Sequence, residues 1–322
     1  MDSASYWAAA YFDKEAIRSE WQSHPKSLER LYRLQDGMAR EDWFFKTYLG
    51  EKSIARAASV GAGRAETEIQ MILKGFVQHF DLYDISPVGI NSAKETLEGH
   101  GLGDRVTCHV VTPGVPVLPL KSYDLVMFVA SLHHMPDLPK TLTSATGALK
   151  RDGHLWCVNE YIGPDRFDYP KDHVAIAARI HSGLPGNLRK HGLNYIHLPT
   201  PAEVEAADPS EAPTSSQIIP TMRAMFPEME VKELHGALAF IIFWGLQHDA
   251  LYETECGKLL VGLLLELDEL LSENKILPCY FAHMVVKKPR KAKLYHGLLR
   301  FYAKQAATKL MSGVVERIKN GK

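Results

Sequence analysis

The sequence predicts an α/β protein with a doubly wound parallel sheet, and three observations lead to this fold class. First, residues 54–160 alternate strand-like and helix-like segments, with strands expected near 56–60, 80–84, 105–111, 123–130 and 153–160. Second, a Gly-x-Gly turn follows the first of these strands. Third, an acid, Asp84, ends the second strand. At 322 residues the chain can bury one core and still carry additions.

The glycine turn runs from Gly61 through Ala62 to Gly63 and leads into a segment with helical spacing, 67–73. Glycines let the backbone turn tightly and come close to a ligand. A tight turn without a ligand is the alternative reading. Asp84 favours the ligand, because it lies 21 positions after Gly63, where an acid at the next strand's tip suits ribose hydroxyls.

The residue at position 66 indicates which nucleotide fits this turn. A dinucleotide fingerprint has its third glycine there, whereas this chain has Glu66. A carboxylate at a helix N-terminus would repel a pyrophosphate but tolerate a ligand with a sulfonium and an amino group. The turn therefore favours S-adenosylmethionine over NAD. After Asp84, Ser86 is expected as the N-cap of the next helix, with Pro87 at its first position.

A buried strand at 123–130 exits into two histidines, and here the sequence resembles the class I S-adenosylmethionine-dependent methyltransferases. The matching pieces, in order, are Val60-Gly61-Ala62-Gly63, Tyr83-Asp84-Ile85-Ser86, Asp124-Leu125-Val126 and Leu132-His133-His134-Met135. The resemblance covers residues 54–160 and extends more loosely to about 288. It implies a Rossmann-like seven-stranded methyltransferase sheet with helices on both faces, S-adenosylmethionine as cofactor and S-adenosylhomocysteine as product.

The resemblance also implies which residues contact the cofactor. They lie at the carboxyl ends of the first four strands: Gly61, Ala62, Gly63, Asp84, Ile85, Ser86, Thr112, Pro113, Val129, Ala130 and Ser131. One departure is Ser59, where the family usually has an acid before the glycine turn. Glu66 or Glu68 is the expected substitute for holding the methionine amino group.

The histidine pair and an acid after the fifth strand are the candidate catalytic groups. A hydroxyl acceptor must lose its proton, and an imidazole with a reference pKa of about 6.5 can take it at neutral pH. By resemblance to sugar O-methyltransferases, His133 or His134 is the expected base, with His134 slightly preferred, and Glu160 supports it. The alternative is that the two histidines only shape the loop. Tyr161 is a weaker candidate.

The chain divides into five predicted segments. They are an N-terminal helical arm at 1–53, the cofactor-binding core at 54–163, a helical lid insertion at 164–227, the end of the core at 228–288 and a basic C-terminal helix at 289–322. The arm is expected to have helices at 11–18 and 25–32, and to pack on the sheet or close over the site. The later core is expected as a strand at 235–247, a helix at 252–273 and a strand at 280–286.

Nine of the 18 prolines lie in the lid segment, which is expected to carry substrate specificity. Its candidate contacts are Asp172, His173, Arg179, His181, Arg189 and Lys190. Its four histidines lack a tight ligand spacing and no cysteine joins them, so no metal site is predicted.

The distribution of charge and the length of the apolar runs limit the possible partners and the cellular location of the protein. Residues 287–322 hold eleven lysines and arginines against one acid, whereas the whole chain has 37 basic and 38 acidic residues. The C-terminal helix is interpreted as a packing or dimerisation element, or else as a contact with an anionic membrane surface. The four cysteines are spread out, no signal peptide is evident and no apolar run can span a bilayer, so a cytoplasmic protein without nucleic-acid partners is expected.

Three functions follow from these predictions. The first is an S-adenosylmethionine-dependent methyltransferase that acts on a small-molecule hydroxyl, in a sugar or a secondary metabolite. The second is a nucleic-acid or protein methyltransferase, supported by the basic C-terminal segment but not by the residues 130–133, which lack the Asn/Asp-Pro-Pro-aromatic motif of base N-methylation. The third is a non-catalytic S-adenosylmethionine-binding protein.

Overall fold

A computed structural model describes residues 2–10, 20–288 and 303. The predicted helix at 11–18 and the predicted C-terminal helix at 289–322 lie outside these residues. Among the described residues no helix combines the length and the apolar character needed to cross a bilayer.

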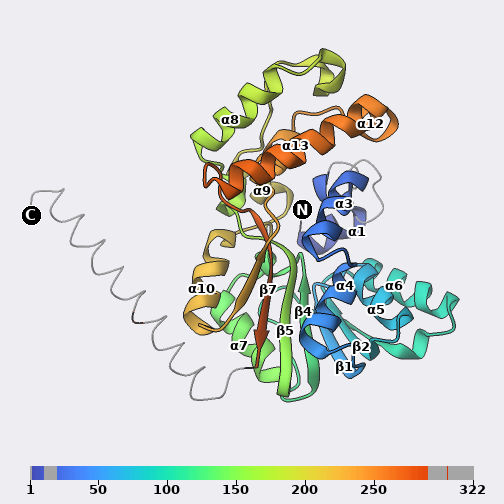
Figure 1. Cartoon of the computed structure of the whole chain (residues 1–322). Coiled ribbons are helices and arrows are strands. Elements are labelled where there is room, and N and C mark those ends of the chain that lie inside the picture. Colours follow the sequence, from blue (N-terminus) through green and yellow to red (C-terminus); the bar gives the residue numbers. More distant parts are fainter. Residues whose placement is uncertain (1, 11–19, 289–302, 304–322) are drawn as a thin grey trace, which may run out of the picture.

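One seven-stranded sheet forms the centre of the molecule (Figure 1). Its spatial order is β3-β2-β1-β4-β5-β7-β6, where β1 to β5 run parallel and β7 is antiparallel to both neighbours. The strands are β1 Ile54–Val60, β2 Val77–Asp84, β3 Val106–Val110, β4 Tyr123–Val129, β5 Leu149–Tyr161, β6 Glu230–Glu233 and β7 Phe281–Lys287. The seven-stranded sheet and all five strands predicted between 54 and 160 are confirmed.

Helices cover both faces of this sheet, because alternate side chains of each strand point to opposite faces. One face packs on α4 (Arg40–Phe44), α5 (Glu66–Leu73) and α6 (Pro87–Gly99). The other packs on α7 (Leu138–Ala148) and α10 (Ile218–Met225).

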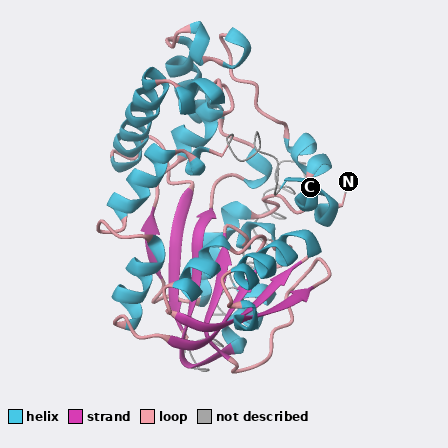
Figure 2. Ribbon diagram, turned by 90° about the vertical axis from the view of Figure 1, so that its right-hand side faces the viewer, coloured by secondary structure: helices cyan, strands magenta, loops and turns pink. Residues whose placement is uncertain are grey.

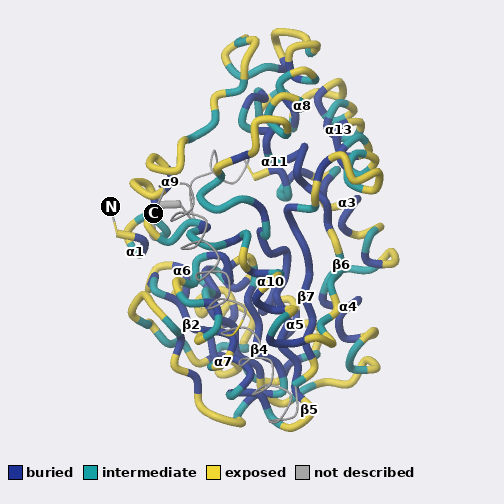
Figure 3. The backbone as a smooth tube through the Cα atoms, turned by 90° about the vertical axis from the view of Figure 1, so that its left-hand side faces the viewer, coloured by how far each residue is buried: buried dark blue, intermediate teal, exposed yellow. Residues whose placement is uncertain are grey.

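A helical layer lies beyond the carboxyl ends of the parallel strands, at the top of Figure 1. It has its own apolar core, built largely from α3 (Pro25–Leu34), α8 (Lys171–Ser182), α11 (Ala237–Phe243) and α13 (Glu255–Glu273). Its remaining helices are α1 (Ser3–Ala10), α9 (Pro201–Ala207) and α12 (His248–Glu253). Figure 2 shows the strands pointing towards this layer, and Figure 3 shows buried chain running continuously from the sheet into it.

The predicted strand at 235–247 is wrong, because this segment forms helix α11 and the edge strand is β6 instead. Periodicity cannot separate a buried strand from a buried helix in a short, uniformly apolar run. The helix is selected by Asp268 on α13, whose carboxylate accepts the backbone N–H groups of Gly236 (2.7 Å), Leu238 (2.8 Å) and Ala239 (3.3 Å). Arg30 in turn donates to Asp268 at 2.8 Å.

Candidate active site

A cavity of about 1190 Å³ opens between the carboxyl ends of the strands and the helical layer. All the predicted cofactor contacts except Ser86 line it. Ser86 is fully buried at the start of α6, as the predicted N-cap residue, although its side chain makes no capping hydrogen bond. His133 and His134 also line the cavity, whereas Glu160 lies behind His133 and is fully buried.

The glycine turn has a shape that side chains would disturb. Gly61 has φ +66°, and a Cβ there would lie 2.6 Å from the Cβ of Ser131, on the loop after β4. Gly63 has φ +53° and donates its N–H to Asp84 at 2.7 Å. The turn therefore presents bare backbone to the cavity, held at the tips of β1, β2 and β4.

Asp84 sits at the tip of β2 with only 3 % of its surface exposed. Burial raises the pKa of its carboxyl, and hydrogen bonds from the N–H groups of Ser86 and Gly63 oppose this. Each oxygen accepts one of these bonds, which leaves lone pairs for ligand hydroxyls on the cavity side. Bare backbone beside a buried acceptor fits the adenosyl part of S-adenosylmethionine.

Glu68 brings a carboxylate to the position where the family usually has an acid before the glycine turn. It is 1 % exposed, lines the cavity and accepts a hydrogen bond from the hydroxyl of Ser59. Glu66 also lines the cavity, but its side chain is 72 % exposed and forms an ion pair with Arg64. Of the two predicted substitutes, Glu68 is therefore the buried one.

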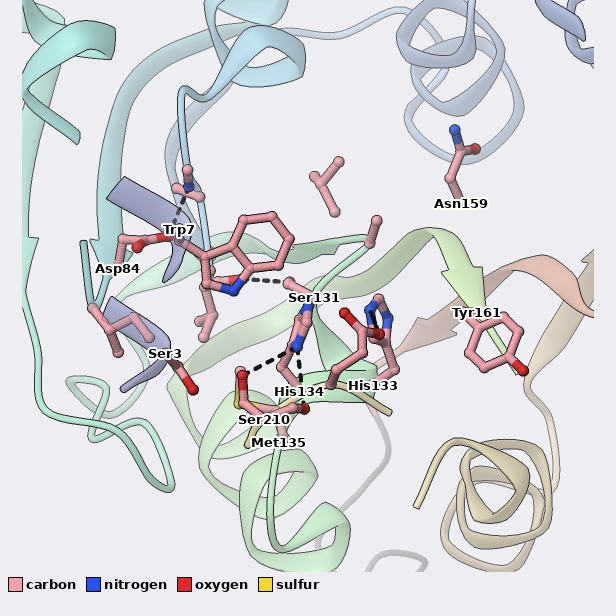
Figure 4. Close-up of a pocket in the computed structure, with 18 of the residues that line it drawn as sticks. Ser3, Trp7, Asp84, Ser131, His133, His134, Met135, Asn159, Tyr161 and Ser210 are labelled. Carbon is pink, nitrogen blue, oxygen red and sulfur yellow. Dashed lines mark hydrogen bonds and ion pairs between the residues drawn. The ribbon is translucent and has the colours of Figure 1, made fainter. Parts of the chain in front are cut away.

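Both ring nitrogens of His133, which is labelled in Figure 4, lie near carboxylates. Its Nδ1 donates to Glu160 at 2.5 Å, and its Nε2 lies 3.5 Å from Glu211. Burial would lower the pKa of His133, but Glu160, Glu211 and Asp208 outweigh this effect and raise it. The imidazole is therefore more basic than usual, with Nε2 towards the cavity.

The carboxylate of Glu160 is fully engaged by the loop that carries His133. Besides the ring of His133, it accepts the backbone N–H groups of Ser131 (3.3 Å), Leu132 (3.1 Å) and His133 (2.9 Å). Its position follows from an irregularity in β5 between Cys157 and Glu160, where Asn159 adopts φ +49°. His283 on β7 supports this bend, because its Nδ1 accepts the N–H of Asn159 at 3.0 Å.

His134 has a different environment from its neighbour. Its Nδ1 donates to the carbonyl of Ser210 at 3.2 Å, and Trp7 packs edge-on against it at 5.3 Å. Burial, followed by the charge of His133, lowers the pKa of His134. The two histidines therefore differ in basicity, and only His133 contacts Glu160.

The N-terminal arm forms one wall of this site through α1. Asp208 accepts hydrogen bonds from the Ser3 hydroxyl at 2.5 Å and from the Trp7 indole at 3.1 Å. Burial would raise the pKa of Asp208, but hydrogen bonds from Ser3 and Ser210 lower it. The buried carboxylate of Asp208 thus joins two segments about 200 residues apart. Figure 4 shows Ser3, Trp7 and His134 in the same part of the pocket.

Among the six predicted lid contacts, only Lys190 lines the cavity. His173 contacts the Tyr280 hydroxyl and His181 the carbonyl of Gly245, so both are structural in the described chain. The same segment supplies other lining residues that were not predicted as contacts: Arg166, Phe167, Pro209, Ser210, Glu211 and Pro213. No local pattern marks them, because loops without periodicity place their side chains only through packing.

Three potential metal ligands lie close together at the histidine pair, although no metal site was predicted. His133, His134 and Glu211 bring three potential ligand atoms within 4.8 Å of one another. Three ligands with an open position are typical of catalytic rather than structural metal sites. The same side chains can therefore act as an acid–base cluster or hold a divalent cation.

The fold and this site define a nucleotide-binding α/β enzyme of the methyltransferase type. Residues 59–155 match the family model described as a methyltransferase domain. This match and the order of the strands support an S-adenosylmethionine-dependent methyltransferase of class I, with S-adenosylmethionine as its cofactor. No curated protein matches the sequence.

Three of the solved structures that are similar to this chain are enzymes that catalyse different reactions from one another. The [4+2]-cyclase SpnF is 15 % identical over 80 % of this chain and 81 % of its own, with a TM-score of 0.46. Phosphoethanolamine N-methyltransferase 2 of Haemonchus contortus is 15 % identical over 84 % of this chain and 58 % of its own, with a TM-score of 0.45. A geranyl diphosphate methyltransferase is 12 % identical over 77 % of both chains, with a TM-score of 0.45.

Proposed function

We propose that this enzyme methylates a hydroxyl group of a small molecule, a sugar or a secondary metabolite, with His133 as the general base. The observation that carries the proposal is the contact between His133 and Glu160 beside the glycine turn. A base must lie within hydrogen-bond reach of the proton that it removes, and a buried carboxylate on the opposite ring nitrogen fixes the useful tautomer. His134, the base slightly preferred from the sequence, has a buried carboxylate only at a longer distance, 3.9 Å from its Nδ1 to Asp208.

The cofactor supplies a methyl group already activated by its sulfonium. The protein has to align the acceptor oxygen and exclude water, and such orientation can contribute about 7–11 kcal/mol. In the proposed reaction the acceptor hydroxyl donates to Nε2 of His133 and gives up its proton there. Glu160 stabilises the resulting imidazolium at Nδ1, and Glu211 lies 3.5 Å from Nε2.

The experiment is a methyl-transfer assay that follows S-adenosylhomocysteine release across hydroxylated acceptors. Methyl transfer that is lost in His133→Ala and kept in His134→Ala supports the proposal. A protein that binds S-adenosylhomocysteine but transfers no methyl group to any acceptor class would favour the non-catalytic alternative. Transfer to RNA or protein, lost at high salt for RNA, would favour the macromolecular alternative.

A second candidate mechanism is metal-assisted activation of the same hydroxyl by a cation at His133, His134 and Glu211. Chelation distinguishes the two mechanisms. Activity that survives EDTA treatment and dialysis supports the general base. Activity that EDTA abolishes and a divalent cation restores would replace His133 as base by a metal site.

A further inference from the structure

Aromatic rings line the cavity on the side of His133 away from the glycine turn. Trp21, Tyr161, Phe167, Phe240 and Phe281 make up this group, called the aromatic chamber below, and all five line the cavity. These residues come from five separate segments of the chain, so no local sequence pattern predicts that they lie together. Figure 4 shows Tyr161 on the far side of His133 from Trp7 and Asp84.

The chamber begins directly at the proposed base. The ring of Tyr161 lies edge-on to His133, with 6.2 Å between the centroids. Tyr161 in turn contacts Phe167 (5.2 Å), Phe240 (5.3 Å) and Phe281 (5.5 Å). Trp21 continues the series at 5.2 Å from Phe281. A continuous wall of rings therefore leads away from the reacting position.

The five rings of this wall carry only two polar atoms, the Tyr161 hydroxyl and Nε1 of Trp21. Among the described residues Nε1 of Trp21 is buried and has no hydrogen-bond partner. The Tyr161 hydroxyl is already used, because it donates to the carbonyl of Pro164 at 2.9 Å. Arg166 also lines the cavity, but its guanidinium is committed to the carbonyls of Glu211 (2.6 Å), Pro209 (2.7 Å) and Asp208 (3.3 Å). A free sugar would bury several hydroxyls here without partners, which is costly.

We propose that the acceptor is a hydroxylated aromatic compound whose ring body occupies the aromatic chamber and whose hydroxyl faces His133. Aromatic rings pack favourably edge-to-face and offset-stacked at the centroid distances found here. A phenolic hydroxyl, with a reference pKa of about 10, is also better matched to an imidazole base than an alcohol is.

The chemistry balances without another reactant. The phenolic proton passes to Nε2 of His133, and a lone pair of the oxygen forms a bond to the methyl carbon. The bond from that carbon to sulfur breaks, and its electron pair remains on sulfur. The reaction in this inference rests on the proposed function. The binding of the acceptor, however, can be tested without catalysis.

The test measures thermal shifts of the full chain saturated with S-adenosylhomocysteine, with 2-naphthol, a hydroxyflavone or methyl glucoside added at millimolar concentration. We expect both hydroxyarenes to raise the melting temperature and methyl glucoside to leave it unchanged. Phe240→Ala should weaken hydroxyarene binding about tenfold or more, since it removes a ring from the wall. The matched control is Tyr195→Ala, which removes an exposed ring outside the cavity lining.

Stabilisation by S-adenosylhomocysteine must persist in Phe240→Ala. If it does not, Phe240→Leu replaces that variant, because leucine keeps apolar volume without a ring. A shift with methyl glucoside alone, or unchanged hydroxyarene affinity in the Phe240 variant, would overturn the inference.

The inference and the proposed function fail in different ways. Ring-dependent binding without methyl transfer keeps the aromatic chamber as the acceptor site and rejects the proposed reaction. Methyl transfer to glucoside that is insensitive to Phe240 keeps the reaction and rejects the chamber.

Discussion

Glu160 accepts the Nδ1–H of His133 at 2.5 Å while the same carboxylate binds three backbone N–H groups of the loop that carries this histidine. One buried acid thus fixes both the loop and the ring orientation. The position and the basicity of the proposed base therefore depend on a residue that does not reach the cavity.

Removal of the imidazole should cost more activity than removal of its neighbour. For His133→Ala we expect a loss of about 10²–10⁴-fold in kcat, the range that a general base contributes. Glu160→Gln should lower kcat less, because the imidazole remains. The measurement is kcat together with the thermal shift by S-adenosylhomocysteine, which should persist in His133→Ala. Equal loss in His134→Ala would contradict the assignment.

The pH dependence should follow His133. Burial opposes the effect, but the surrounding carboxylates raise the pKa of His133, and a base acts only after losing its proton. Activity should therefore rise with pH through a value above the ordinary 6.5. Glu211→Gln removes one of these carboxylates, so the inflection should move to lower pH. A profile that is flat from pH 6 to 9 would exclude a histidine base.

Glu68 is expected to bind the amino group of the cofactor's methionine part. Burial raises the pKa of Glu68, and a bound ammonium would compensate its charge. Glu68→Gln should weaken S-adenosylhomocysteine binding by roughly 10–100-fold, as for loss of a charged hydrogen bond. Binding of 5′-methylthioadenosine, which lacks the amino acid part, should hardly change. The exposed Glu66→Gln is the matched control, and equal weakening of both ligands would remove this role.

His283 should make the protein acid-sensitive. Burial, together with the charges of Arg40 and Lys232, lowers the pKa of His283 to about 3, whereas the unfolded chain has about 6.5. Between these values the unfolded chain binds more protons, so the free energy of unfolding falls as the pH falls. In His283→Gln the difference in this free energy between pH 7 and 4.5 should shrink by about 2–3 kcal/mol in urea denaturation. An unchanged difference would show that another group titrates.

The buried pair of Arg30 and Asp268 should be important for stability. Asp268→Ala leaves Arg30 without its acid and the first N–H groups of α11 without an acceptor. Breaking such a pair costs about 3–5 kcal/mol of the free energy of unfolding. Glu29→Ala, which removes an exposed ion pair with Lys26, should cost less than about 1 kcal/mol. Similar urea midpoints for the two variants would show that the buried pair contributes no more to stability than the exposed one.

The local pattern of the sequence determined the parallel half of the sheet, the glycine turn and the histidine pair. Their signals are short-range: an apolar run between turn residues, two glycines one residue apart and an acid at a strand tip. The contact between His133 and Glu160 also followed from the sequence in part, since both residues stand at the ends of neighbouring strands. Which histidine meets Glu160 required the register of the loop and the bend in β5.

The tertiary structure alone decided α11 and the aromatic chamber. Residues 237–243 are uniformly apolar, so their periodicity favours neither a helix nor a strand. The helix forms where Asp268, about thirty residues further along, satisfies its first N–H groups. The same helix then turns Phe240 into the cavity. Contacts between residues far apart in the chain leave no periodic trace, and for that reason only the folded structure revealed them.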